Sequence, residues 1–87
     1  MVTRSAFTKK ADDFRLLLIE ERKRIGLTQA ELAERLSRPQ SFISKVERGE
    51  RRLDVLEFFE LAKALRIDPI SFLSSFFRTE STRTRSK

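Results

Sequence analysis

Residues 26–49 read GLTQAELAERLSRPQSFISKVERG and contain two short amphipathic segments separated by a break. Apolar residues recur with the same one-two-five spacing on both sides of the break, and this spacing lies along one face of an α-helix. The break is Ser37-Arg38-Pro39, where proline lacks an amide donor and disfavours helical geometry in the residue before it. The stretch therefore predicts two helices joined by a short turn. Their apolar positions are Leu32, Ala33 and Leu36 in the first and Phe42, Ile43 and Val46 in the second.

Both helices have signals at their ends. Thr28-Gln-Ala-Glu31 has the spacing of a capping box, in which the hydroxyl and the carboxylate each accept from the backbone amide of the other residue. Gly49 can take the left-handed conformation that ends the second helix. Helices this short are not stable alone, so they must bury their apolar faces against each other and against further helices.

Three more helices are expected outside this stretch. Apolar residues at helical spacing precede Gly26, which can end a helix. Asp54-Val-Leu-Glu57 is a second capping signal, and Asp68-Pro69 combines a favoured N-cap with proline at the first helical position. The expected helices cover about 12–25, 54–65 and 68–77. We predict an all-α, compact five-helix domain over 11–77.

The net charge of +6 is distributed unevenly along the chain. Residues 1–10 carry three basic and no acidic side chains, 38–52 carry five basic and two acidic, and 78–87 carry four basic and one acidic. We expect 1–10 to be a flexible basic arm and 78–87 a disordered basic tail, because both are polar and lack sustained periodicity. Positive charge gathered in this way favours a nucleic-acid partner, although charge runs are also common on ordinary solvated surfaces.

The chain has neither cysteine nor histidine, which excludes disulfides, thiolate and ordinary zinc sites, and a histidine general base. Its acidic pairs are expected on exposed helix surface without a pocket, so we predict no enzymatic activity and no cofactor. The longest aliphatic run, 16–19, is too short for a membrane span or a signal peptide, and we expect a cytoplasmic protein without a membrane partner. The acidic pairs are Asp12 with Asp13 and Glu20 with Glu21.

Residues 26–49 and LEFFELAKALRIDP at 56–69 resemble the Cro and phage-repressor family of helix-turn-helix DNA-binding proteins, also called lambda-repressor-like or xenobiotic response element proteins. The resemblance rests on GLTQ, ELAERL, ISKVERG and ELAKAL, and it covers about residues 15–73. Ser37 stands where the family usually has glycine in the turn. The resemblance implies a homodimeric transcription regulator, a repressor, that reads a palindromic operator in double-stranded DNA and is associated with the bacterial nucleoid.

The outer face of the second helix in this motif is the candidate for reading bases. It carries short or forked hydrogen-bonding side chains and no carboxylate, which suits base edges beside phosphates, although a plain solvent face would have the same residue types. The resemblance implies that the first turns of this helix enter the major groove. The candidate base-reading residues are Gln40, Ser41, Ser44 and Lys45.

Other residues are candidates for binding the DNA backbone. The resemblance places a phosphate at the N-terminus of the first helix of the motif, where free amides and the helix dipole attract anions. Thr28 could equally serve only as a cap. Arginines in and after the second helix are expected to bind phosphates without reading sequence. The candidate phosphate contacts are Thr28, Gln29, Arg38, Arg48, Arg51 and Arg52.

Two charged residues occupy positions on otherwise apolar helix faces. Arg22 shares a face with Leu18 and Ile25, and Glu47 follows Ile43 by four residues. Charges on an inner face are rarely left unpaired, so we expect a structural ion pair between Arg22 and Glu47 rather than two solvated charges. The family resemblance implies the same pair.

The apolar residues of 68–77 spread over roughly 160° of a helix circumference, wider than the stripe of about 100° that one core contact needs. We expect one edge, Ile70, Leu73 and Phe77, to pack on the preceding helix while Phe72 and Phe76 face outward, although the spacing leaves open which edge is which. The surplus surface can be buried against a second copy, and all five residues are candidates for a dimer interface. The alternative is a helix fully absorbed by the core.

Two other functions fit the same fold. An antitoxin-like or other protein-interaction module would use this surface on a protein partner. RNA binding lacks the aromatic stacking platform that it requires, because the eight phenylalanines mostly fit core positions. The sequence shows no sensor domain, so no small-molecule effector is expected.

Overall fold

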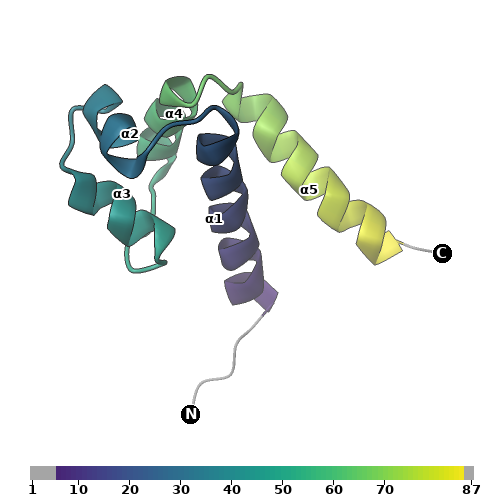
Figure 1. Ribbon diagram of the computed structural model, residues 1–87. Helices are drawn as coiled ribbons and strands as arrows, with labels where there is room; N and C mark the ends of the chain where they lie inside the picture. Colours follow the sequence, from purple (N-terminus) through teal and green to yellow (C-terminus); the bar gives the residue numbers. More distant parts are fainter. Residues whose placement is uncertain (1–5, 86–87) are drawn as a thin grey trace, which may run out of the picture.

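The computed structural model describes the backbone of residues 6–85 and the side chains of residues 9–78. Within these limits all regular elements are α-helices, so the prediction of an all-α five-helix fold is confirmed (Figure 1). No helix in the described part of the chain is long and apolar enough to cross a membrane. The helices are α1 (Ala6–Arg24), α2 (Gln29–Arg35), α3 (Gln40–Glu47), α4 (Val55–Ala64) and α5 (Pro69–Arg85).

The first and last helices are longer than expected. Helix α1 begins at Ala6 instead of near residue 12, and α5 runs to Arg85 instead of 77. Neither glycine nor proline interrupts 1–25 or 70–87, so nothing in the sequence stops a helix that core contacts have started. These bounds overlap the proposed tails, whose outer residues, 1–5 and 86–87, lie outside the described part. The division into arm, domain and tail stays a prediction.

The turn between α2 and α3 uses a serine in the conformation that glycine usually adopts. Ser37 has a φ of 56°, in the left-handed region. Its amide donates to the Glu34 carbonyl at 3.0 Å, and the next amide, of Arg38, donates to the Ala33 carbonyl at 3.0 Å. These two bonds form a Schellman motif and satisfy the last carbonyls of α2. The motif therefore keeps its turn without glycine, at a backbone cost of about 1–2 kcal/mol.

The core lies where α1, α2, α3 and α4 meet. The apolar stripes predicted for α2 and α3 are part of it, with Leu36 only partly buried at the edge. Leu65 forms the C-cap of α4, and its side chain is fully buried in the core. The buried side chains of the core are Leu18, Leu32, Ala33, Phe42, Ile43, Val46, Phe58, Leu61, Ala62 and Leu65.

An aromatic cluster joins α1 to α4 and α5. The ring of Phe14 on α1 lies 5.4 Å from the ring of Phe58, 5.7 Å from that of Phe72 and 5.6 Å from that of Phe76, measured between centroids. Rings at these distances in tilted and edge-on arrangements attract each other beyond the area they bury. Phe14 thus links α5 to α1.

The expected edges of α5 are wrong except at Leu73, which packs against the core as expected. Ile70 and Phe77 are 63% and 54% exposed, whereas Phe72 is partly buried against the core. Phe76 also turns inward, because its ring contacts Phe14. The sequence suggested packing on α4 alone, but α5 contacts α1 as well, and this contact turns Phe72 and Phe76 inward. In Figure 1, α5 slants away from α1 toward its C-terminal end.

Candidate nucleic-acid interface

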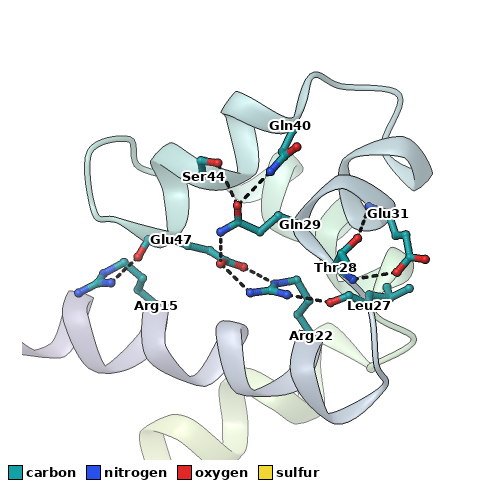
Figure 2. A network of polar contacts seen from close by, with 9 residues as sticks. All are labelled: Arg15, Arg22, Leu27, Thr28, Gln29, Glu31, Gln40, Ser44 and Glu47. Carbon is teal, nitrogen blue, oxygen red and sulfur yellow. Dashed lines mark hydrogen bonds and ion pairs between the residues drawn. The ribbon is translucent and has the colours of Figure 1, made fainter.

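The N-terminus of α2 is closed by the predicted capping box. Thr28 Oγ1 accepts a hydrogen bond from the Glu31 amide at 3.0 Å, and Glu31 Oε1 accepts one from the Thr28 amide at 2.9 Å (Figure 2). The Thr28 hydroxyl is therefore a cap in the free protein. Its additional contact with a phosphate stays a prediction.

Helix α3 buries one face and presents the other to solvent. Its apolar side chains, Phe42, Ile43 and Val46, are all buried in the core. Because these three side chains fix the rotation of the helix about its axis, the polar residues between them must point away from the body. The predicted base-reading residues lie on this outer side, with Gln40, Ser41 and Lys45 exposed and Ser44 partly buried.

A two-point ion pair joins α1 to the end of α3. Arg22 Nε lies 2.7 Å from Glu47 Oε2, and Arg22 Nη2 lies 3.0 Å from Glu47 Oε1 (Figure 2). Arg22 also donates through Nη1 to the Leu27 carbonyl at 2.7 Å. Because Arg22 is only 8% exposed, little water can reach its charge, and the contacts between Arg22 and Glu47 replace the hydration that both groups lose. The two residues are thus paired, as their positions in the sequence suggested, and they hold α3 against α1.

Gln29 connects this ion pair to the outer face of α3. Its Nε2 donates to Glu47 Oε1 at 2.8 Å, and its Oε1 accepts from Ser44 Oγ at 3.0 Å and, more weakly, from Gln40 Nε2 at 3.4 Å (Figure 2). The first residue of α2 therefore lies beside two candidate base-reading residues. Its expected contact with a phosphate stays a prediction, and it would have to use the amide group that this network already engages.

Arg15, about two turns before Arg22 along α1, holds the C-terminal end of α3. Its Nη1 donates to the Glu47 carbonyl, and its Nη2 lies 3.4 Å from a carboxylate oxygen of Asp12 (Figure 2). The guanidinium also lies against Gly49, where a Cβ atom would come within 3.3 Å of Arg15 Nε. A cation at this end of a helix is favoured by the helix dipole. Arg15 and Arg22 together fix α3 with respect to α1.

Two of the predicted phosphate contacts flank a core aromatic residue. The guanidinium carbons of Arg38 and Arg51 lie 4.4 Å and 4.7 Å from the centroid of the Phe42 ring. Arg51 donates to both carboxylate oxygens of Glu57, at 2.9 Å and 2.8 Å, and Arg38 lies 3.8 Å from the same carboxylate. These two arginines are therefore arranged by Phe42 and Glu57 before any ligand binds.

Glu57 is the acidic residue that lies within ion-pair distance of both Arg38 and Arg51. The hydrogen bonds from Arg51, and next the backbone amide of Asp54, lower the pKa of Glu57 from 4.5 to about 2. Both interactions favour the carboxylate over the carboxylic acid. Glu57 is also the acidic member of the capping box that opens α4. The residue thus links the start of α4 to the arginines beside α3.

The other two arginines after the motif differ from each other. Arg48 donates to both oxygens of Glu50, at 2.9 Å and 3.1 Å, and this contact raises the pKa of Arg48. Arg52 is exposed, and no described side chain forms an ion pair with it. Within the described residues no cluster of three or more acidic side chains could hold a metal ion.

Three residues that organise this surface were not identified from the sequence. Gln29 was expected at a phosphate, Arg15 was not singled out, and Glu57 was recognised only as a helix cap. The contacts of all three cross from one helix or loop to another, and periodicity within a single helix does not reveal such contacts. A basic residue seven positions before Arg22, on the same side of the helix, was the available signal for Arg15.

Two short helices joined by a tight turn, with the second one exposing a polar face bordered by arginines, define a helix-turn-helix protein. The family described as Helix-turn-helix (HTH_3) matches residues 18–72 of this chain. The chain belongs to this family. It is a helix-turn-helix transcription regulator of the XRE, or lambda-repressor-like, type.

Known proteins with similar sequences or structures agree with this class. The chain is 36% identical over 53 residues to the uncharacterized HTH-type transcriptional regulator y4dJ of Sinorhizobium fredii, covering 61% of this chain and 69% of the relative. An XRE-family like protein from Pseudomonas syringae pv. tomato superposes with a TM-score of 0.81 at 44% identity, over 84% of this chain and 89% of that one. The restriction-modification controller protein C.AhdI from Aeromonas hydrophila gives a TM-score of 0.66 at 34% identity, over 71% and 94%.

Proposed function

We propose that this regulator binds double-stranded DNA in a sequence-specific manner as a homodimer and represses transcription from a palindromic operator. Helix α3 enters the major groove, where each base pair presents a distinct pattern of donors and acceptors. The observation that carries this proposal is the outer face of α3, which is polar, free of carboxylates and held in a fixed orientation by Arg22 and Glu47.

The side chains on this face are suited to reading bases. Gln40 can bind adenine through both its amide atoms, and Lys45 can donate to the acceptors of guanine. Ser41 and Ser44 are short enough to contact base edges beside them. Gln29 restricts Gln40 and Ser44 in the free protein, so less side-chain freedom remains to be lost when DNA binds.

The proposed phosphate contacts border the same face. Arg52 lacks an ion-pair partner among the described residues, so it can meet a phosphate without giving up another contact. Arg48 and Arg51 must exchange Glu50 and Glu57 for a phosphate, and Arg38 must leave the same Glu57. Thr28 and Gln29 would contribute from the start of α2. These exchanges predict that Arg52 contributes most to the nonspecific part of the affinity.

The proposed dimer uses the apolar side chains that α5 leaves exposed. Ile70 and Phe77 are seven residues apart on α5 and therefore lie on one side of the helix. A twofold partner would cover them and would place two α3 helices about 34 Å apart, which matches successive major grooves on one side of the duplex. Phe72, Leu73 and Phe76, the other predicted interface residues, contact this chain's own α1 and core.

The dimer can be tested by sedimentation of the free protein. Phe77→Glu should convert a dimer to a monomer and weaken operator binding, because the buried apolar contact is replaced by a charge. Leu56→Glu is the matched control, since Leu56 is a similarly exposed apolar residue on α4, at 74%. A wild-type monomer, or a dimer lost only in Leu56→Glu, would contradict an interface on α5.

Sequence reading can be tested by selecting bound duplexes from a random pool. The wild type should enrich one palindrome, and Gln40→Ala or Lys45→Ala should each relax preference at one or two positions by about 1–3 kcal/mol. Arg52→Ala should weaken binding to all duplexes alike. It should also reduce the slope of log affinity against log salt concentration by nearly one unit, the contribution of one phosphate contact. Lys63→Ala, an exposed lysine on α4, is the control. Unchanged preferences in both α3 variants would contradict the placement of α3 in the groove.

A further inference from the structure

A partly enclosed cavity lies between the N-terminal half of α1 and the chain segment that follows α3. Its volume is about 360 Å³. Phe14 and Leu18 from α1, Val46 from α3 and Leu53 from the α3–α4 loop form its apolar part. Small-molecule sites have volumes of roughly 300–1,000 Å³ and combine an apolar lining with a few polar groups, and this cavity meets both conditions at the lower end of the range.

The polar part of the lining is mainly cationic. Arg15, Arg51 and Arg52 contribute to it, together with one acid, Asp12. Arg15 Nε is buried and finds no hydrogen-bond acceptor in the described part of the chain, even though both its terminal nitrogens are engaged. Arg52 has no ion pair there either. Arg52 therefore brings to the cavity a positive charge that no described side chain pairs with, beside the buried, unsatisfied Nε of Arg15.

We propose that this cavity binds a small amphipathic anion, a compound with an apolar body and one carboxylate or sulfonate group, and that the bound anion weakens DNA binding. The apolar body would cover Phe14, Leu18 and Val46, and the acidic group would meet the arginines at the rim. A neutral ligand would leave the charge of Arg52 unmatched, and a purely polar anion would leave the apolar lining in contact with water.

The position of the cavity gives the bound anion two routes to the DNA-binding surface. Arg51 and Arg52 both line the cavity and are proposed phosphate contacts, so an anion held there competes with DNA for the same cations. Val46 and Gly49 at the end of α3 also line the cavity, beside the Arg15 that anchors this helix. The effect on DNA rests on the proposed function, whereas the binding of the anion does not.

Binding can be measured on the full chain without DNA, using the fluorescence of 8-anilinonaphthalene-1-sulfonate. We expect one saturable site per chain. Ala11→Phe adds a ring at the exposed rim of the cavity and should weaken binding about tenfold or more. Lys23→Phe adds the same ring to an exposed part of α1 outside the cavity and should leave binding unchanged. Equal binding by wild type and Ala11→Phe would overturn the site.

A second variant separates the cavity from the exposed apolar side chains elsewhere on the surface. Leu56→Ser combined with Phe77→Ser removes one exposed large apolar side chain from α4 and one from α5. We expect this double variant to keep the saturable signal. Loss of the signal would show that the probe binds the outer surface and would overturn the proposal.

The preference for an anion can be tested with N-phenyl-1-naphthylamine, which has the same ring system without the sulfonate. Arg52→Gln should weaken binding of the sulfonate several-fold and leave binding of the neutral probe unchanged. The variant replaces an exposed side chain, so it should fold normally. An equal effect on both probes, or none on either, would overturn the assignment of charge recognition to Arg52.

The effect on DNA needs a third measurement. Saturating sulfonate probe should weaken duplex binding by the wild type several-fold and should not affect Ala11→Phe. Binding of the probe in the cavity with undiminished duplex affinity would overturn the regulatory half of the proposal. A wild type that binds no duplex at all would instead contradict the proposed function, and the probe titrations would still decide whether the cavity is a site.

Discussion

Helix α1 holds the rest of the molecule through two unlike sides. On one side Arg15 and Arg22 reach α3 through hydrogen bonds and an ion pair, and on the other Phe14 packs among the rings of α4 and α5. Hydrogen bonds tolerate little change in distance and angle, whereas ring contacts are favourable over a wider range of geometries. The polar side of α1 therefore sets the position of α3, while the aromatic side packs α1 against α4 and α5.

The largest loss of stability should come from a substitution on the aromatic side. Phe58→Ala removes a buried ring that contacts both Phe14 and Phe72, and we expect a loss of about 3–5 kcal/mol in the free energy of unfolding. Denaturant titration measures this loss. At a temperature where the variant is folded, its preference among duplexes should match the wild type, because the contacts of α3 with α1 are intact.

Phe59→Ala is the matched control for this prediction. Phe59 is the next residue on α4 but is 41% exposed, so its removal should cost clearly less. Equal losses for the two variants, or an altered base preference in folded Phe58→Ala, would break the distinction between the two sides of α1.

On the polar side, Glu47→Ala should affect both stability and reading. It strands the buried Arg22, which costs about 3–5 kcal/mol for a fully buried pair, and the slight exposure here points to the lower end. It also removes the acceptor that holds Gln29, so Gln40 and Ser44 become less restricted and base preference should relax. Thermal unfolding and duplex selection measure the two effects.

Glu50→Ala is the control on this side, because Glu50 pairs with Arg48 in an exposed ion pair three residues after Glu47. Its effect on the melting temperature should be small, since such pairs contribute little. A melting temperature of Glu47→Ala equal to that of the wild type would show that Arg22 and Glu47 are solvated independently in solution.

The two sides of α1 also differ in how far the sequence predicts them. The Arg22–Glu47 pair could be expected because each charge interrupts an apolar face, and the apolar faces of α2 and α3 could be located from their spacing. The packing edge of α5 could not, because a wide apolar stripe does not say which neighbour it meets, and contact with Phe14 turned Phe72 and Phe76 inward in place of Ile70 and Phe77. The hydrogen bonds of Gln29 depend on the angle between α2 and α3, and the periodicity of apolar residues within each helix does not predict this angle.

Two glycines offer a finer test of the polar side. Gly49 and Gly26 have φ values of 80° and 78°, so alanine at either position pays a similar backbone cost of about 1–2 kcal/mol. At Gly49 the new Cβ would also press on Arg15 Nε at 3.3 Å, while at Gly26 it would meet nothing within 4 Å. We expect Gly49→Ala to be the less stable variant and the only one with weaker operator binding. Equal behaviour of the two would show that Arg15 does not position α3.

The smallest change in stability should follow from loss of the Glu57 carboxylate, which belongs to neither of the two sides of α1. Its pKa of about 2 in the folded protein lies below the ordinary 4.5, mainly because Arg51 donates two hydrogen bonds to it. A group whose pKa is lowered by folding stabilises the native state above its unfolded pKa, and this contribution is lost as the pH falls from about 4.5 toward 2. Glu57→Gln cannot titrate, so its melting temperature should fall less steeply than that of the wild type over this interval.

At neutral pH the same variant should melt no more than about 5 °C below the wild type, since the ion pair is near the surface and the cap is partly kept by the amide. It should also bind all duplexes somewhat more tightly, because Arg51 and Arg38 no longer have to leave a carboxylate to meet a phosphate. Glu60→Gln, whose more exposed carboxylate lies 3.7 Å from Arg38, is the control and should show neither change to the same extent. Parallel pH curves for Glu57→Gln and the wild type would mean that Arg51 does not hold Glu57 in solution, and Arg51 would then be as free to meet phosphate as Arg52.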